Sequence, residues 1–216
     1  LNETAVRNST SGTQSISMSG AITVTGGGSG SDTWIRQSGS GAQNITTGGA
    51  LRLEALVANT GTVSIESGTG TQTVNVTDVI ALDNQAGGRV ALRSGGAQNI
   101  NADSMTIALA SPNGTSPYAG VSAVGSQIIR MVGGAAPASL TLTNTSGISG
   151  SLVEVMTAGN QTLSLYGARY TNAGMLQIGS AAGLGAAKVE AGGSQTIIAG
   201  GIQIQGGLTS AARASL

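Results

Sequence analysis

The sequence predicts an all-β protein, a parallel β-helix solenoid of about seven turns with three short strands in each turn. The first observation is a motif, Gly-x-Gln-x-aliphatic, that occurs seven times; its glutamines are Gln14, Gln43, Gln72, Gln98, Gln127, Gln161 and Gln195. Subtracting successive glutamine numbers gives 29, 29, 26, 29, 34 and 34, a period typical of stacked repeats. The second observation is a pair of alternating apolar sets that follow each motif.

The first strand of each turn, strand A, is predicted to begin at the motif glutamine. A period of two places Gln72, Val74 and Val76 on one face, and the other copies repeat this pattern. The residue between the glutamine and the aliphatic residue is polar in six of the seven copies, as expected for the opposite, solvent-facing side. We expect the seven amides to share one corner of the coil and to hydrogen-bond along its axis as a ladder. The alternative is that they lie half-solvated at strand edges.

The glycine two residues before each glutamine is expected either to turn the corner with a positive φ or to allow close packing. In both cases the role of the motif is structural.

Strands B and C are predicted from the two apolar sets. Strand B contains Ile22/Val24, Leu51/Leu53, Ile80/Leu82, Met105/Ile107, Leu140/Leu142, Leu176/Ile178 and Ile202/Ile204. Strand C is the weaker set, with Ile35, Val63/Ile65, Val90/Leu92, Val121, Val153/Val155 and Val189. Each strand is expected to pair in parallel with its copy one turn on, about 4.8 Å away. We expect a right-handed coil, because parallel crossovers are overwhelmingly right-handed.

Two rival folds fit the sequence less well. A helical protein would need apolar residues at i, i+3 and i+4, and the frequent glycines would cost about 1 kcal/mol each in helix interiors. A β-propeller blade takes about 40 residues and four strands, which exceeds the spacing here. Residues 1–216 are therefore interpreted as one domain, an excerpt of a longer array or a stackable filament subunit.

Composition limits the possible functions. Nine basic and nine acidic residues, 8% of the chain together, give no footprint for nucleic acid or for a polybasic membrane contact. Cysteine and histidine are absent, which excludes disulfides, Cys/His metal sites, histidine bases and cysteine nucleophiles. No apolar run approaches the roughly 20 residues of a membrane span. We expect no enzymatic activity, no cofactor, no metal, no nucleic-acid partner and no membrane insertion.

Two kinds of candidate site remain. Asp78 and Asp103 follow their motif glutamines by six and five residues, so they are expected to lie near one another at the A-to-B corner, either as an acid pair or as solvated turn residues. Insertions at 132–139 and 166–174 are expected to project side by side, and a longer loop at 110–120 to leave another corner. Possible contact residues in these loops are Tyr118, Tyr166, Arg169 and Tyr170; the alternative is that the insertions are neutral.

The two ends are predicted to lie in the same phase of the repeat. Residues 3–14 match residues 32–43 position for position, and residues 211–215 resemble residues 5–9. The chain is therefore expected to begin and end in strand C with nearly a whole number of turns. No capping helix is predicted, and uncapped ends expose strand edges and core, so we expect them to stack on something.

The motif Gly41-Ala42-Gln43-Asn44-Ile45, followed by Ala50-Leu51-Arg52-Leu53, resembles the repetitive stalks of filamentous-haemagglutinin-like bacterial surface proteins. The resemblance covers the whole chain. It implies secretion to the bacterial cell surface and a role in adhesion, aggregation or a biofilm matrix. The chain departs from the family in having no recognisable secretion-signal domain.

Three functional hypotheses follow. The first is a non-enzymatic segment of a secreted surface filament or adhesin that self-associates or continues end to end, with host or matrix glycans or proteins as further partners. The second is a β-helix that binds or cleaves polysaccharide through the Tyr166 to Tyr170 loop or the Asp78/Asp103 corner. The third, ice binding, ranks last because the outward threonines Thr23, Thr106 and Thr141 are interrupted by Arg52, Ala81 and Gln177.

Overall fold

The computed structural model describes residues 3–26, 30–56, 61–110, 114, 116–134, 136–167, 173–180, 184–207 and 213–216. Every regular element in these ranges is a β-strand. The strands form three parallel sheets, one of eight strands and two of seven. The predicted fold, an all-β parallel β-helix of about seven turns with three strands per turn, is confirmed.

We name the sheets after the predicted strands. Sheet A contains β2 (Gln14–Met18), β5 (Gln43–Thr47), β8 (Gln72–Val76), β11 (Gln98–Ala102), β14 (Gln127–Val132), β17 (Gln161–Tyr166) and β20 (Gln195–Ile198). Sheet B contains β3 (Ile22–Gly26), β6 (Leu51–Ala55), β9 (Val79–Asn84), β12 (Ser104–Leu109), β15 (Ser139–Asn144), β18 (Met175–Ser180) and β21 (Gly201–Gln205). Sheet C contains β1 (Glu3–Asn8), β4 (Asp32–Gln37), β7 (Thr62–Ser67), β10 (Arg89–Ser94), β13 (Tyr118–Ala123), β16 (Leu152–Thr157), β19 (Ala186–Ala191) and β22 (Arg213–Ser215).

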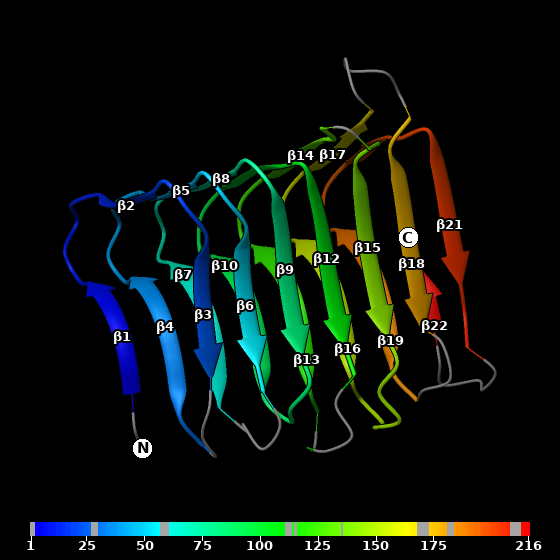
Figure 1. The fold of residues 1–216 in the computed structure, drawn as a ribbon, viewed down its shortest axis with the longest axis horizontal. Coiled ribbons are helices and arrows are strands. Elements are labelled where there is room, and N and C mark those ends of the chain that lie inside the picture. The colour runs from blue at the N-terminus through cyan, green and yellow to red at the C-terminus, as the bar shows by residue number, and fades with distance from the viewer. Residues whose placement is uncertain are drawn as a thin grey trace.

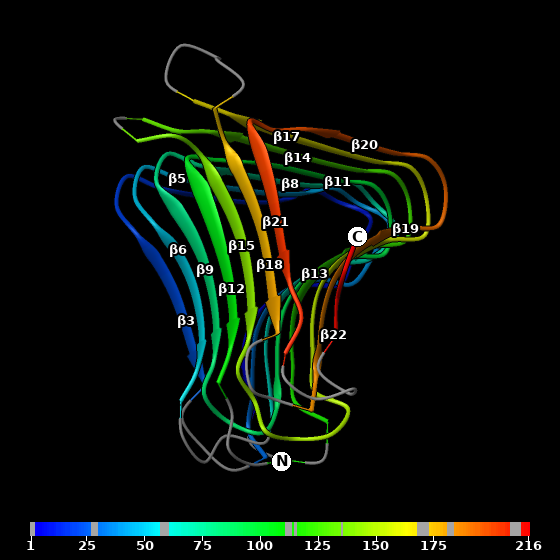
Figure 2. The same ribbon diagram turned by 90° about the vertical axis from the view of Figure 1, so that its right-hand side faces the viewer.

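The chain coils in the right-handed sense expected from its parallel crossovers. In Figure 1 the coil axis runs horizontally from the N-terminus to the C-terminus, and the strands of sheet B run downward on the near side. The chain returns upward along sheet C behind them and crosses forward over the top along sheet A. Seen from the C-terminal end in Figure 2, this path turns counterclockwise as it approaches the viewer.

The register of the sheets places equivalent residues of successive turns beside each other. In sheet B, Leu82 pairs with Leu53 on one side and Ile107 on the other. Sheet C, whose apolar set is the weakest in the sequence, keeps the same order, since Ile65 pairs with Ile35 and Leu92. The apolar positions of each strand therefore form columns along the rod.

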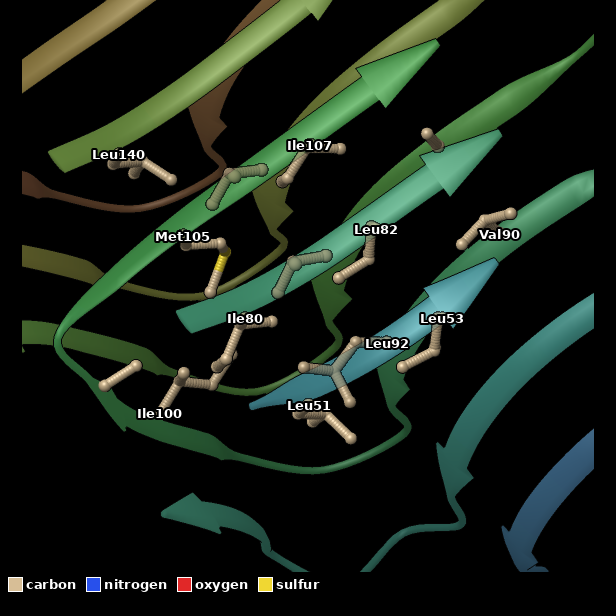
Figure 3. Close-up of a cluster of buried hydrophobic side chains, with 14 of the residues drawn as sticks. Leu51, Leu53, Ile80, Leu82, Val90, Leu92, Ile100, Met105, Ile107 and Leu140 are labelled. Carbon is tan, nitrogen blue, oxygen red and sulfur yellow. The ribbon is translucent and has the colours of Figure 1, made fainter. Parts of the chain in front are cut away.

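The core lies between the inner faces of the three sheets. Sheets B and C contact each other, and sheet A covers their upper edge. Figure 3 shows the column of Leu51, Ile80 and Met105 from sheet B near Leu92 of sheet C and Ile100 of sheet A. All five side chains have no exposed surface. Each such burial contributes about 1.5–3 kcal/mol relative to an exposed side chain.

The terminal turns differ from the prediction in burial and in register. Met18, Ile202 and Ile204 were assigned to inner faces but are 51%, 49% and 45% exposed, because each has a neighbouring turn on one side only. The last strand lies in sheet C as predicted, but Arg213 pairs with Ala186, four positions from the register inferred from sequence. Small Ala and Ser side chains carry no apolar pattern strong enough to fix a register.

The structure contains no helix that is long and apolar enough to cross a membrane within the residues it describes.

Truncation of a core side chain in a middle turn should destabilise the rod strongly. Leu82→Ala removes a fully buried side chain and should lower the free energy of unfolding by about 2–5 kcal/mol. The control Ile204→Ala removes an exposed side chain of the last turn and should change it by about 0.5 kcal/mol. Urea denaturation followed by circular dichroism measures both; equal losses would contradict the central core.

Candidate functional site

The seven motif glutamines form a continuous ladder along the corner between sheets C and A. Each side-chain Nε2 donates to the Oε1 of the preceding glutamine, and all six amide-to-amide bonds measure 2.7 Å. The five middle glutamines are at most 1% exposed. Burying a primary amide without partners would be costly, so the stacked arrangement is what allows glutamine at this inner position.

The ladder also ties sheet A to sheet C. Gln72 Nε2 donates a second bond to the Arg93 carbonyl oxygen at 3.0 Å, and Gln98 Nε2 donates to the Leu92 carbonyl oxygen at 3.4 Å. The donor hydrogens of these amides are thereby divided between the neighbouring turn and the neighbouring sheet. The ladder forms at the predicted corner, and the half-solvated alternative applies only to the last glutamine, Gln195, which is exposed.

The motif glycines serve close packing rather than positive φ. A Cβ atom on Gly41 would lie 2.1 Å from the Gly12 carbonyl oxygen, and one on Gly70 would lie 2.1 Å from the Gly41 carbonyl oxygen. Among the described residues, positive φ values occur at other glycines: Gly30, Gly114 and Gly150. Of the two predicted roles, close approach of successive turns is therefore the one observed.

Asp78 and Asp103 lie on adjacent turns at the A-to-B corner, as predicted. The Asp103 backbone N–H donates to the Asp78 carbonyl oxygen at 3.1 Å. Partial burial, and then the negative charge of Asp78, raise the pKa of the Asp103 carboxyl above its usual value. No third carboxylate joins them, since no group of three or more Asp and Glu side chains suited to a metal is found in the described part of the chain.

The predicted contact loops are placed only in part. The insertions follow β14 and β17 on adjacent turns, and Tyr166 is the last residue of β17. Its ring centroid lies 5.7 Å from the guanidinium carbon of Arg130. Arg169 and Tyr170 lie outside the described residues.

Tyr118 was predicted to lie in a contact loop, and this placement is wrong. It is the first residue of β13 and is only 6% exposed. Its ring centroid lies 4.1 Å from the guanidinium carbon of Arg89, and its hydroxyl donates to Glu154 Oε1 at 3.0 Å. Burial, together with the Glu154 carboxylate, raises the pKa of the Tyr118 phenol. The ring crosses Gly120, where a Cβ atom would lie 2.5 Å from the Tyr118 hydroxyl, so glycine is required there.

Tyr118 belongs to a charged and aromatic surface that the sequence prediction missed, the outer face of sheet C. The described strands of sheets A and B carry only Arg52, Glu54, Asp83 and Arg130 as charged residues. The strands of sheet C carry eleven, all at the outward positions: Glu3, Arg7, Asp32, Arg36, Glu66, Arg89, Arg93, Glu154, Lys188, Glu190 and Arg213. The tryptophan, Trp34, lies on the same face, with its ring centroid 4.5 Å from the guanidinium carbon of Arg36.

Ion pairs connect this face from one turn to the next. Glu66 lies between two arginines, with Oε2 at 3.5 Å from Arg36 Nε and Oε1 at 3.9 Å from Arg93 Nη1. Further along, Lys188 Nζ lies 3.5 Å from Glu154 Oε2 and 2.6 Å from Glu190 Oε2. The Glu190 carboxylate raises the pKa of Lys188, and the Lys188 ammonium in turn lowers the pKa of Glu190.

The outer face of sheet C is also hollowed beside the corner with sheet A. Figure 2 shows sheet C curving outward before it meets sheet A. A hollow of about 270 Å³ lies there, lined by Arg36, Glu66, Arg93, Ser122 and Met156 among others. Donors, acceptors and hydroxyls at such a place are suited to binding a polar ligand. The signal for this face was present in the sequence as charged residues alternating with the apolar residues of strand C.

Comparison with known proteins adds no identification. No protein-family model matches the chain, and searches of curated proteins and of solved structures likewise find no match.

Interruption of the glutamine ladder should cost more than the loss of one hydrogen bond. Gln72→Leu removes the donor that Gln43 Oε1 receives and the amide acceptor of Gln98 Nε2, both of which are buried. We expect a loss of about 2–4 kcal/mol in the free energy of unfolding. The control Gln195→Leu removes one bond at the exposed end and should cost less than about 1 kcal/mol. Chemical denaturation that finds both variants equal would exclude a stabilising ladder.

The acid pair should make stability depend on pH. Because folding raises the pKa of Asp103 above its ordinary 3.8, the folded state binds this proton more tightly, and stability is lost as pH rises through the interval between the two values. Asp103→Asn should therefore raise the melting temperature at pH 7, and its advantage should vanish at pH values below 3.8. Glu54→Gln on sheet B controls for net charge; the hypothesis fails if the two variants give the same pH profile.

Proposed function

We propose that the chain is a non-enzymatic structural segment of a secreted bacterial surface filament or adhesin. The observation that carries the proposal is the unbroken glutamine ladder, in which every turn repeats the same amide contact. A cross-section that repeats by translation builds a rod whose length is set by the number of turns. Seven turns at about 4.8 Å would extend for roughly 34 Å.

The chemistry of the described residues supports a structural role more than a catalytic one. The carboxylates at the A-to-B corner form a pair, and Glu66, Glu154 and Glu190 of sheet C form ion pairs with Arg or Lys side chains. Polysaccharide cleavage would require two carboxyl groups placed on either side of a glycosidic bond. Location at the bacterial surface remains part of the proposal and rests on the resemblance of the repeated motif to filamentous-haemagglutinin-like stalks.

The two terminal turns supply the means of extension. Ile202 and Ile204 at one end are half-exposed, and at the other end Val6, Ile22 and Ile35 line an apolar hollow of about 340 Å³. The equivalent side chains of interior turns are covered by the next turn. We infer that these faces are covered by further turns, belonging to the same array or to another copy.

Electron microscopy of the purified chain, with light scattering, tests this proposal. The wild type should form rods longer than one chain as its concentration rises, and Ile204→Asp should shorten them, because a charge would be buried at the junction. Ile128→Asp is a matched control, since Ile128 is 48% exposed on the outer face of sheet A while Ile204 is 45% exposed. Compact monomers at all concentrations, or equal effects of the two variants, would contradict end-to-end association.

A further inference from the structure

The hollow on sheet C is an axial groove rather than a local pit. Arg36, Glu66, Arg93, Ser122 and Met156 occupy the same position on five successive strands, β4, β7, β10, β13 and β16. All five line the hollow. Four turn spacings of about 4.8 Å separate the first from the last, so the groove follows the rod for roughly 19 Å. A groove of this shape fits an extended chain better than a compact ligand.

The charges in the groove alternate along the rod. The Arg36 and Arg93 side chains are 37% and 51% exposed, whereas the Glu66 side chain between them is 17% exposed. The ion pairs, at 3.5 and 3.9 Å, are longer than the about 2.8 Å of a charge-assisted hydrogen bond. Both guanidiniums therefore retain N–H donors for a ligand, and stacking on the Trp34 ring holds Arg36 in position.

The spacing of these groups favours one kind of polymer. Arg36 and Arg93 are two turns apart, about 9.6 Å along the axis, which is close to the length of two sugar rings in an extended glycan. Carboxylates on every second sugar would meet the two arginines, and the sugar between them would present hydroxyls to Glu66. A polymer with a charge on every unit would place an anion against Glu66 and be repelled.

The floor of the groove supports the same ligand. Ser122 presents a hydroxyl in the outward column, and Met156 closes one end with an apolar side chain. Ser67 and Ser94 lie beneath this column, where their buried hydroxyls bond to each other at 2.9 Å. Hydroxyl groups donate and accept hydrogen bonds, as a sugar ring requires. A nucleic acid would instead need an unbroken basic surface for its evenly spaced phosphates.

We propose that this groove binds a linear polysaccharide in which acidic and neutral sugars alternate. Arg36 and Arg93 bind carboxylates of alternate sugars, Glu66 binds the hydroxyls of the sugar between them, and Ser122 binds hydroxyls of the next sugar beyond Arg93. The proposal concerns the side of the rod and does not depend on how its ends are joined.

Isothermal titration of the whole chain with hyaluronan oligosaccharides, in which glucuronate alternates with N-acetylglucosamine, tests the proposal. Binding should be clearly tighter than that of oligogalacturonate, which is charged at every unit, or of neutral cello-oligosaccharides. Arg93→Ala should weaken hyaluronan binding about tenfold. Ser122→Phe should abolish it by filling the groove without a change of charge, and Arg52→Ala, an exposed arginine of sheet B, should leave it unchanged.

A further variant tests the role assigned to Glu66. Glu66→Gln removes the central negative charge with little change of size, so oligogalacturonate should then bind as well as hyaluronan. Circular dichroism melting of each variant confirms that it is folded. The proposal is overturned if hyaluronan oligosaccharides do not bind, if oligogalacturonate binds the wild type equally well, or if Arg52→Ala weakens binding as much as Arg93→Ala. Preferential binding of polyglutamate or RNA would likewise reject it.

Discussion

Parallel, in-register pairing of each strand with its own copy one turn later is the constraint on which this structure depends. It converts every sequence position into a column of neighbours about 4.8 Å apart. A residue is then tolerated only if its side chain can pack or bond against the equivalent side chain of the next turn, whether that residue is identical or different. Aliphatic side chains meet this condition by packing, as in the column of Leu53, Leu82 and Ile107. Glutamine meets it by donating to the residue before and accepting from the residue after.

The same constraint separates the inner surface from the outer one. Inside, most columns are aliphatic or amide, and the small hydroxyl residues among them, such as Thr47 and Ser94, are buried and hydrogen-bonded. Outside, sheet C places unlike residues next to one another, and Arg36, Glu66 and Arg93 satisfy each other because their charges alternate between turns. Tyr118 and Gly120 are similarly matched, since the ring of one occupies the space left by the missing side chain of the other. The residues that differ from turn to turn are therefore concentrated on the outer face of sheet C, where they can contact other molecules.

The architecture could be predicted from the sequence because every turn repeats the same pattern of glutamine and apolar residues. Val63 and Ile65 could be assigned to strand C only because Val90/Leu92 and Val153/Val155 recur in the same phase. Arg213 was placed four residues away from its actual register because the Ala and Ser residues around it carry no such pattern. Asp78 and Asp103 could be brought together by counting from the glutamines. The groove could not be predicted, because its shape depends on the curvature of sheet C. Tyr118 was misplaced because its burial depends on Glu154 in the next turn.

The amide ladder also gives the molecule a direction. All six bonds run the same way, with the nitrogen of each glutamine directed toward the preceding turn and its oxygen toward the following one. The dipoles of the amides therefore add along the corner. If the chain folds from its N-terminus onward, the glutamine Oε1 of each completed turn is an oriented acceptor before the next turn has formed. The corner of the coil can thus act as a template, on which every new turn docks in a register and orientation already fixed by the last.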